Sequence, residues 1–158
     1  MILMGVIGHK NAGKTTLVER LIVELSGRGL VVSTLKRTHH AVDLEVPGTD
    51  THRHRLAGAA QVLLASDHRL ALLEELAAPM PLDALLALLA PCDVALAEGW
   101  KRGTHPRIEV WRPETGRPPL AAADPTIRAV AATGDPGVAQ PVLPLDDVGA
   151  IADFVCSS

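Results

Sequence analysis

Eight residues near the start of the chain have the types and spacing that bind a polyphosphate. The stretch Gly8-His9-Lys10-Asn11-Ala12-Gly13-Lys14-Thr15 has the pattern G-x-x-x-x-G-K-T. The two glycines allow a tight loop whose backbone N–H groups turn inward, toward negatively charged oxygens. We expect the Lys14 ammonium on the β- and γ-phosphates and the Thr15 hydroxyl on Mg²⁺. The pattern therefore predicts a nucleotide-binding loop that runs from Gly8 to Thr16.

Such a loop needs a strand before it and a helix after it. The apolar run Ile2–Ile7 predicts the strand, and leucines at every fourth position predict a helix from Thr16 to Leu25. The glycine-rich stretch 26–29 then ends this helix. In this context the motif indicates a phosphate site rather than a plain glycine turn between a strand and a helix.

Glu98 is the predicted acidic partner of the loop. Ligands of an open parallel sheet bind beyond the carboxyl ends of its strands, and Glu98 directly follows the apolar strand Val94–Ala97. A carboxylate there would belong to the Mg²⁺ shell or orient the attacking water, so Lys14 and Glu98 are the candidate catalytic residues. Asp93 precedes the same strand and should lie at the opposite edge of the sheet. The alternative for Glu98 is a solvated turn carboxylate.

A polar loop rich in cations and histidines follows the predicted strand 31–36. Its Asp43 is a further candidate ligand of Mg²⁺, beside Thr15 and Glu98. The loop is an anion-binding or switch segment, a metal-transfer site or merely solvated; His and Asp suit Zn or Ni, but their spacing here matches no tight ligand set. The residues expected to face a second anionic ligand or a partner are Lys36, Arg37, His39, His40, Arg53, Arg55, Lys101 and Arg107.

The remaining pattern predicts an α/β fold. We expect a three-layer P-loop NTPase sandwich with a mostly parallel sheet, and an added antiparallel β region stays open. Leucines cover nearly every face of the helix expected at 81–90, so either the core or a second copy of the chain should bury it. The other expected elements are a helix capped by Asp50 or Thr51 that runs to about Leu56, strands at 61–65, 107–112 (half-exposed) and 127–132, a strand or helix at 69–76, a surface connection at 113–119, and a helix capped by Asp146 or Asp147 that ends at Val155.

Composition limits the classes of function. A chain of 158 residues fits a single domain, residues 1–158, and a net charge of −3 argues against a general nucleic-acid binder. Aromatic residues make up only 2% of the chain, so no stacking platform for single strands is expected. No apolar run approaches the length needed to cross a membrane, and two isolated cysteines fit a reducing compartment. We therefore expect a cytoplasmic protein without a nucleic-acid or membrane partner.

The base of the nucleotide is not determined by these motifs. Proteins that bind GTP commonly recognise guanine with N-K-x-D, and the chain has no such tetrapeptide. Asp135, in Thr133-Gly134-Asp135, is only a partial substitute because no lysine stands beside it to stack on a base. The choice between guanine and adenine stays open at this level.

These motifs together resemble the molybdopterin-guanine dinucleotide biosynthesis protein B (MobB) family. The resemblance rests on the phosphate loop, on Lys36-Arg37-Thr38-His39-His40 with Asp43, Pro47-Gly48 and Asp50, on Arg53, Arg55 and Ala57-Gly58-Ala59, and on Glu98-Gly99-Trp100-Lys101 with Pro106-Arg107-Ile108-Glu109-Val110. Trp100 stands where family members usually carry Phe, and few residues match beyond Pro113.

The resemblance implies a homodimeric GTP-binding protein with weak GTPase activity and Mg²⁺ as cofactor. Such a protein would assist a molybdopterin guanylyltransferase, which joins GMP to molybdopterin or to its molybdenum-loaded form. The basic loops would then face the pterin phosphate or the partner enzyme. Two other functions fit the residues: a nickel or zinc metallochaperone GTPase that uses the histidines, and a small-molecule P-loop kinase whose acceptor site lies between Arg37 and Arg55.

Overall fold

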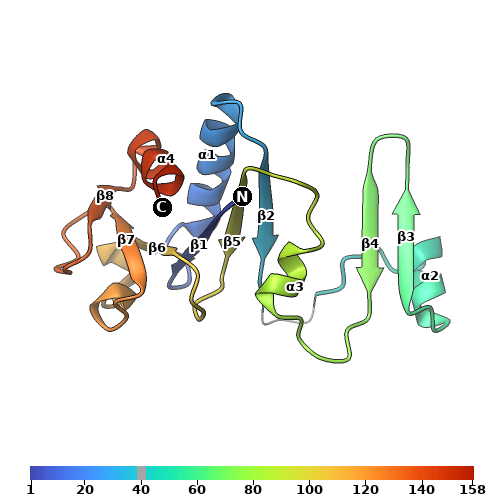
Figure 1. Cartoon of the computed structure of the whole chain (residues 1–158). Coiled ribbons are helices and arrows are strands. Elements are labelled where there is room, and N and C mark those ends of the chain that lie inside the picture. Colours follow the sequence, from blue (N-terminus) through green and yellow to red (C-terminus); the bar gives the residue numbers. More distant parts are fainter. Residues whose placement is uncertain (39–41) are drawn as a thin grey trace. The chain divides into compact units, whose positions relative to one another are not determined.

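The computed structural model describes residues 1–38 and 42–158 (Figure 1). The chain forms two compact units. Met1–Arg37 and Leu86–Ser158 make the first, here called the sheet unit, and Thr38–Leu85 make the second, called the hairpin unit. Within the described ranges, no helix is long and apolar enough to cross a membrane.

The sheet unit contains a six-stranded sheet in which all neighbouring strands are parallel. The strand order is β2-β5-β1-β6-β7-β8, so β1 lies between β5 and β6 (Figure 1). Because the strands are parallel, their carboxyl ends meet at one edge, where ligands of such sheets bind. The strands are β1 (Ile2–Gly8), β2 (Val32–Lys36), β5 (Val94–Glu98), β6 (Arg107–Trp111), β7 (Ile127–Ala132) and β8 (Val142–Pro144).

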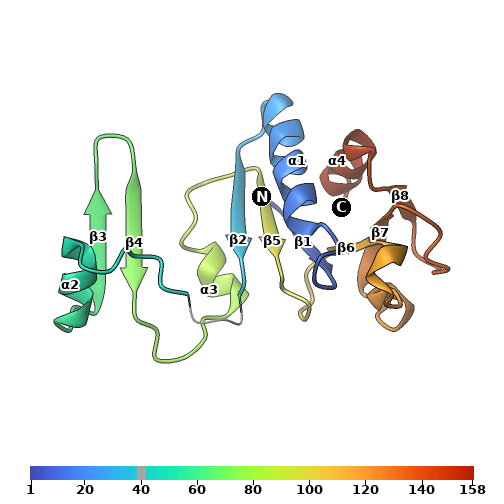
Figure 2. The same ribbon diagram turned by 180° about the vertical axis from the view of Figure 1, so that it is seen from behind.

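Two helices, α1 (Lys14–Gly27) and α4 (Val148–Cys156), pack on the same face of this sheet (Figures 1 and 2). The predicted leucine row of α1 is fully buried there against Ile151 and Val155 of α4. Each such side chain contributes about 1.5–3 kcal/mol by leaving water. Asp147 caps α4 as predicted, since its side chain accepts a hydrogen bond from the Ala150 N–H at 3.0 Å.

The other face of the sheet is covered by the segment after β6, with the short 3₁₀ helices η1 (Pro113–Thr115) and η2 (Leu120–Ala122). Ile7, Ile127 and Val130 pack there against Leu120 and Ala121. Alternate strand residues point to opposite faces, so this smaller cluster is separate from the one beneath α1. Strand β8 extends the sheet beyond β7 and was not predicted from the sequence.

The prediction that β6 is half-exposed is wrong. Arg107 is 2% exposed and Glu109 is fully buried, because β6 lies between β1 and β7 and both of its faces are covered. The Glu109 carboxylate accepts hydrogen bonds at 2.8 Å from the backbone N–H groups of Leu120 and Ala121. The polar positions of this strand therefore mark buried groups with partners rather than a solvent-facing side.

The hairpin unit combines α2 (Asp50–Leu56) with β3 (Gln61–Ala65) and β4 (Leu70–Glu74). The two strands pair antiparallel, with Gln61 opposite Glu74. This pairing confirms an added antiparallel β region and shows that the ambiguous stretch 69–76 is a strand. The N-cap of α2 is Thr49, one residue before the earliest cap predicted.

Helix α3 (Leu82–Leu86) is shorter than the predicted helix 81–90, and none of its residues is buried. The helix does not extend to Ala90 because Ala90 precedes Pro91. The proline ring clashes sterically with a helical conformation of the residue before it. The next turn instead closes with a bond from the Leu89 N–H to the Leu86 carbonyl at 3.1 Å. Leu88 is 61% exposed, so the core does not bury these leucines, and cover by a second copy stays a prediction.

Candidate functional site

The predicted phosphate loop connects β1 to α1 at the carboxyl edge of the sheet. Gly8 has φ 145°, and a Cβ there would lie 2.4 Å from the Val110 carbonyl of β6, so no larger residue fits. Gly13 caps α1 in the left-handed region with φ 97°. The helix begins with a bond from the Leu17 N–H to the Gly13 carbonyl at 3.0 Å. Both glycines of the motif are thus required by the backbone.

Lys14 is the first residue of α1, and its ammonium donates to the His9 carbonyl across the loop at 2.7 Å. Burial lowers the pKa of Lys14 below its usual value, and the positive charges of Lys101 and Lys36 act in the same direction. Glu98 alone among the named groups acts to raise that pKa. Positive charges that gather in this way favour a polyanionic ligand.

Thr15 and Glu98 meet beside this ammonium. The Thr15 hydroxyl donates to Glu98 Oε1 at 2.9 Å, and the Glu98 side chain is only 10% exposed. Lys36, at the end of β2, donates to the Thr15 hydroxyl at 3.3 Å and lies 3.5 Å from Glu98 Oε1. A hydroxyl and a carboxylate that converge next to a phosphate loop are the hard oxygen donors that Mg²⁺ prefers, so this pair fits the ion.

The turn after Glu98 is fixed by its backbone. Gly99 has φ 95°, and a Cβ there would lie 2.9 Å from the Arg37 carbonyl. The Arg37 N–H in turn donates to the Glu98 carbonyl at 2.9 Å. Asp93 lies at the other end of β5, where its carboxylate accepts from the Val31 N–H at 2.8 Å. As expected from the sequence, Glu98 rather than Asp93 reaches the loop.

Arg107, predicted to face a second anionic ligand, points inward. Its guanidinium donates to the Lys101 carbonyl and to the Thr126 hydroxyl, and it lies 3.3 Å from Asp124. The Thr126 hydroxyl and N–H, together with the Arg107 charge, hold the pKa of Asp124 below its usual value. We therefore assign Arg107 to anchoring the loop that carries Lys101. Lys101 and Arg37 themselves are exposed.

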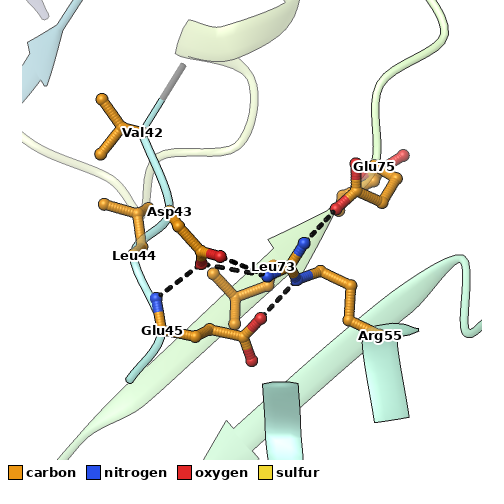
Figure 3. A pocket seen from close by; sticks show the side chains of 8 residues that line it. Val42, Asp43, Leu44, Glu45, Arg55, Leu73 and Glu75 are labelled. Atoms are coloured by element: carbon orange, nitrogen blue, oxygen red, sulfur yellow. Dashed lines mark hydrogen bonds and ion pairs between the residues drawn. The ribbon is translucent and has the colours of Figure 1, made fainter. Parts of the chain in front are cut away.

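Arg55 of α2 is the centre of an ion-pair cluster in the hairpin unit (Figure 3). It donates to both oxygens of Asp43, at 3.0 and 2.9 Å, to Glu75 at 3.2 Å and to Glu45. Figure 3 shows the carboxylates of Asp43, Glu45 and Glu75 directed at its guanidinium. The cluster ties the segment before α2 and the end of β4 to the helix. An anion that bound Arg55 would have to displace one of these carboxylates.

These contacts shift the titration of the carboxyl groups. The Arg55 guanidinium and the Thr51 hydroxyl lower the pKa of Glu45 below its usual value of 4.5. The Glu45 N–H and Arg55 lower the pKa of Asp43 below its usual value of 3.8. Since both are depressed in the folded unit, the stability they provide is complete above these usual values and is lost as the pH falls through the lowered ones.

We expect acid to loosen the hairpin unit through this cluster. Lowering the pH from about 6 to about 3 should accelerate amide exchange in β3, β4 and α2, after correction for intrinsic rates. In Arg55→Met the same amides should exchange fast already at neutral pH and change little with acid. Hydrogen exchange followed by mass spectrometry checks both outcomes, and equal pH dependence in the two proteins would contradict the assignment.

The other predicted residues of this segment are less constrained. Arg53 is exposed and lies 4.0 Å from Asp50, and the His52 ring accepts from the Gly48 N–H at 3.2 Å. His39 and His40 lie outside the described residues. Among the residues that are described, no group of three or more His, Cys, Asp or Glu has the geometry to hold a metal ion.

Sequence reasoning missed Arg112, which follows β6 and lies against the phosphate loop. Its Nε donates to the Ala12 carbonyl at 3.1 Å, and the guanidinium would be 3.4 Å from a Cβ at Gly13. His9 also contacts this region, since its Nε2 lies 3.0 Å from the Pro118 carbonyl. No local motif in the sequence indicates this contact, because it depends on the pairing of β6 with β1, which brings the end of β6 to the loop.

Known proteins of one family are similar to this chain in sequence and in fold. Residues 3–133 match the family model described as MobB, molybdopterin guanine dinucleotide synthesis protein B. The chain belongs to this family. The resemblance predicted from the sequence is thereby confirmed.

Relatives and solved structures agree with this assignment. The molybdopterin-guanine dinucleotide biosynthesis adapter protein of Haemophilus influenzae is 36% identical over 155 residues, 97% of this chain and 86% of that protein. The Escherichia coli protein of the same name is 36% identical over 97% of this chain and 90% of its own length. A MobB homolog from Bacillus stearothermophilus has a TM-score of 0.74 at 28% identity, covering 100% of both chains. Bacillus subtilis MobB, with a TM-score of 0.77 at 23% identity, shows the same α/β fold.

Proposed function

We propose that the chain binds GTP with Mg²⁺ and acts as a weak GTPase in molybdenum cofactor biosynthesis, where it assists the attachment of GMP to molybdopterin. The hydrogen bond between Thr15 and the buried Glu98, next to the Lys14 ammonium, carries the nucleotide part of this proposal. The family and the two relatives from Haemophilus influenzae and Escherichia coli, which are molybdopterin-guanine dinucleotide biosynthesis adapter proteins, support the pathway.

Each residue of the site then has a physical role. The loop from Gly8 to Thr16 would enclose the phosphates with its N–H groups, and Lys14 would leave the His9 carbonyl to reach the β- and γ-oxygens. Thr15 and Glu98 would hold Mg²⁺, which when bound neutralises charge on those oxygens. Glu98 would also orient the attacking water.

The exposed cations around this site support a second anionic partner. Lys36, Arg37 and Lys101 stand at the ends of β2 and β5, beside the proposed nucleotide. These cations would bind the phosphate of molybdopterin, either free or molybdenum-loaded, or they would contact an acidic surface of the guanylyltransferase. We further propose that both units serve one nucleotide-binding domain and that the protein works as a homodimer.

Calorimetric titration of the full chain tests the nucleotide part directly. GTP should bind with one site per chain in the presence of Mg²⁺ and more weakly in EDTA. Adding the nucleotide-loaded chain to a molybdopterin guanylyltransferase should then increase the yield of the guanine dinucleotide form. A chain that binds no GTP at any Mg²⁺ concentration would refute the proposal, as would a transferase that responds equally to a nucleotide-free variant.

Replacing Glu98 by glutamine should weaken the Mg²⁺-dependent part of GTP binding by about 10–100-fold, because an amide lacks the charge that holds the ion. The Mg²⁺ concentration that gives half of the full GTP affinity should rise accordingly. Asp93→Asn is the matched control, since it removes a carboxylate from the other end of the same strand. Equal shifts in the two variants would contradict the assignment of Glu98.

A further inference from the structure

The order of the strands determines on which side of the phosphate loop the nucleoside must lie. Glu98 on β5 and Lys36 on β2 lie on one side of β1, and both contact the hydroxyl of Thr15 in the loop. If the ion and terminal phosphate occupy that side, the ribose and base extend toward the strands on the other side, β6 and β7. The residues that follow β6 and β7 are therefore the ones to examine for a base.

A pocket of about 240 Å³ lies at that place. The phosphate loop contributes Lys10 and Asn11, and the segment after β6 contributes Arg112, Glu114 and Thr115. Asn11 has φ 64°, a left-handed backbone conformation that few residues adopt, and this shapes the wall on the loop side. The pocket therefore lies between the phosphate loop and the segment after β6, and the nucleotide motifs assign no role to that segment.

One edge of the Arg112 guanidinium is held against the loop. One of its five N–H groups donates to the Ala12 carbonyl, while Nε and Nη2 would lie 3.4 and 3.6 Å from a Cβ at Gly13. The backbone of Gly13 and this guanidinium are therefore in close contact. A planar guanidinium fixed in this way offers a surface on which a purine ring can stack.

Glu114 is placed by a short, closed turn. The Thr115 N–H and hydroxyl both donate to the Arg112 carbonyl, at 3.1 and 2.8 Å, and the Gly116 N–H donates to the Pro113 carbonyl at 3.0 Å. Pro113 fixes φ at the first position of this turn. The carboxylate therefore stands two residues after the stacking cation, which is also the spacing of Lys and Asp in N-K-x-D.

We propose that Arg112 and Glu114 form the base subsite of the bound nucleotide and select guanine. This inference rests on the proposed binding of a nucleoside triphosphate. Arg112 stacks on the purine, and the Glu114 carboxylate accepts hydrogen bonds from the N1–H and the 2-amino group of guanine. Adenine presents an acceptor at N1 and no amino group at C2, so the same carboxylate would face a lone pair and lose both bonds.

Asp135 is the other carboxylate that could recognise the base, but in the structure it stabilises a turn. It accepts a hydrogen bond from the Gly137 N–H at 2.8 Å and so closes the turn after β7. The neighbouring Gly134 is close to Pro113, since a Cβ on Gly134 would lie 3.8 Å from the proline ring. Asp135 therefore belongs to an adjacent loop but does not line the pocket, which makes it the matched control.

The test measures the affinities of the full chain for GTP, ATP and xanthosine triphosphate by calorimetry in Mg²⁺. Xanthine has a carbonyl in place of the 2-amino group of guanine, and a glutamine amide can donate to it while accepting from N1–H. Glu114→Gln should therefore weaken GTP binding by about 10–100-fold and make xanthosine triphosphate the preferred ligand. Arg112→Ala should weaken GTP and ATP by similar factors, because stacking does not distinguish bases. Asp135→Asn should leave all ratios unchanged.

The outcomes separate this inference from the proposed function. A wild-type chain that binds GTP and whose base preference is unchanged in Glu114→Gln would overturn the inference alone. A shift of preference in Asp135→Asn would also overturn it and transfer the role to that residue. A folded wild-type chain that binds none of the three nucleotides would overturn both proposals. Thermal unfolding of each variant without nucleotide confirms that a lost affinity is not a lost fold.

Discussion

Replacing Lys14 by alanine is expected to weaken GTP binding by about 100-fold or more. The ammonium lies against the glycine loop, and its hydrogen bond to the His9 carbonyl shows that the side chain already spans the loop. Loss of charge-assisted bonds to two phosphate groups accounts for an effect of this size. Calorimetric titration with GTP in Mg²⁺ measures it.

The control for Lys14→Ala is Arg128→Ala, which removes an exposed positive charge from β7. Its GTP affinity should stay within about twofold of the wild-type value, since an exposed charge outside the loop acts only through solvent. The Lys14 variant should also unfold at nearly the same temperature as the wild type when no nucleotide is present. Unchanged GTP affinity in Lys14→Ala would remove the phosphate assignment of the loop.

The second large effect concerns stability. Arg107→Met should lower the free energy of unfolding by about 3 kcal/mol, because it leaves Asp124, the Thr126 hydroxyl and the Lys101 carbonyl without their shared donor. The thioether has nearly the length of the arginine stem, so the loss is mainly electrostatic. Urea unfolding followed by circular dichroism should show the change as a lower midpoint.

The comparison variant for Arg107 is Arg128→Met on the neighbouring strand. Arg128 is exposed, and its removal should change stability by no more than about 0.5 kcal/mol. If Arg107 instead served an anionic ligand, Arg107→Met would keep the wild-type midpoint and lose affinity for that ligand. The two results discriminate between an anchoring and a binding role for this buried arginine.

The Arg55 cluster shows how a basic residue can be read wrongly from its neighbours in sequence. Arg53 and Arg55 stand two positions apart in a run of cations and histidines, and the sequence predicts that both face an anion. In the structure Arg53 is exposed, whereas the Arg55 side chain is 20% exposed and shared among three carboxylates (Figure 3). These carboxylates stand 10, 12 and 20 positions from Arg55 in the chain, and residue types alone cannot indicate that all three contact it.

Local chemistry explains what could be predicted. The loop Gly8 to Thr15, the helix that follows it and the short apolar strand before Glu98 depend on backbone conformations and periodicities that neighbouring residues impose. The same holds for the cap of α4 at Asp147. The meeting of Thr15 with Glu98 also followed, because parallel strands bring their carboxyl ends to one edge.

The sequence by itself therefore determined the phosphate loop, the parallel α/β class, the acidic residue at its edge and the family. Only the tertiary structure decided that Arg107 and Glu109 are buried, that 61–74 forms a separate hairpin, and that Arg112 and Glu114 join the loop. The physical reason is clearest for Arg112. Its partner Ala12 lies 100 positions away along the chain, and only the pairing of β6 with β1 brings the two residues within hydrogen-bonding distance.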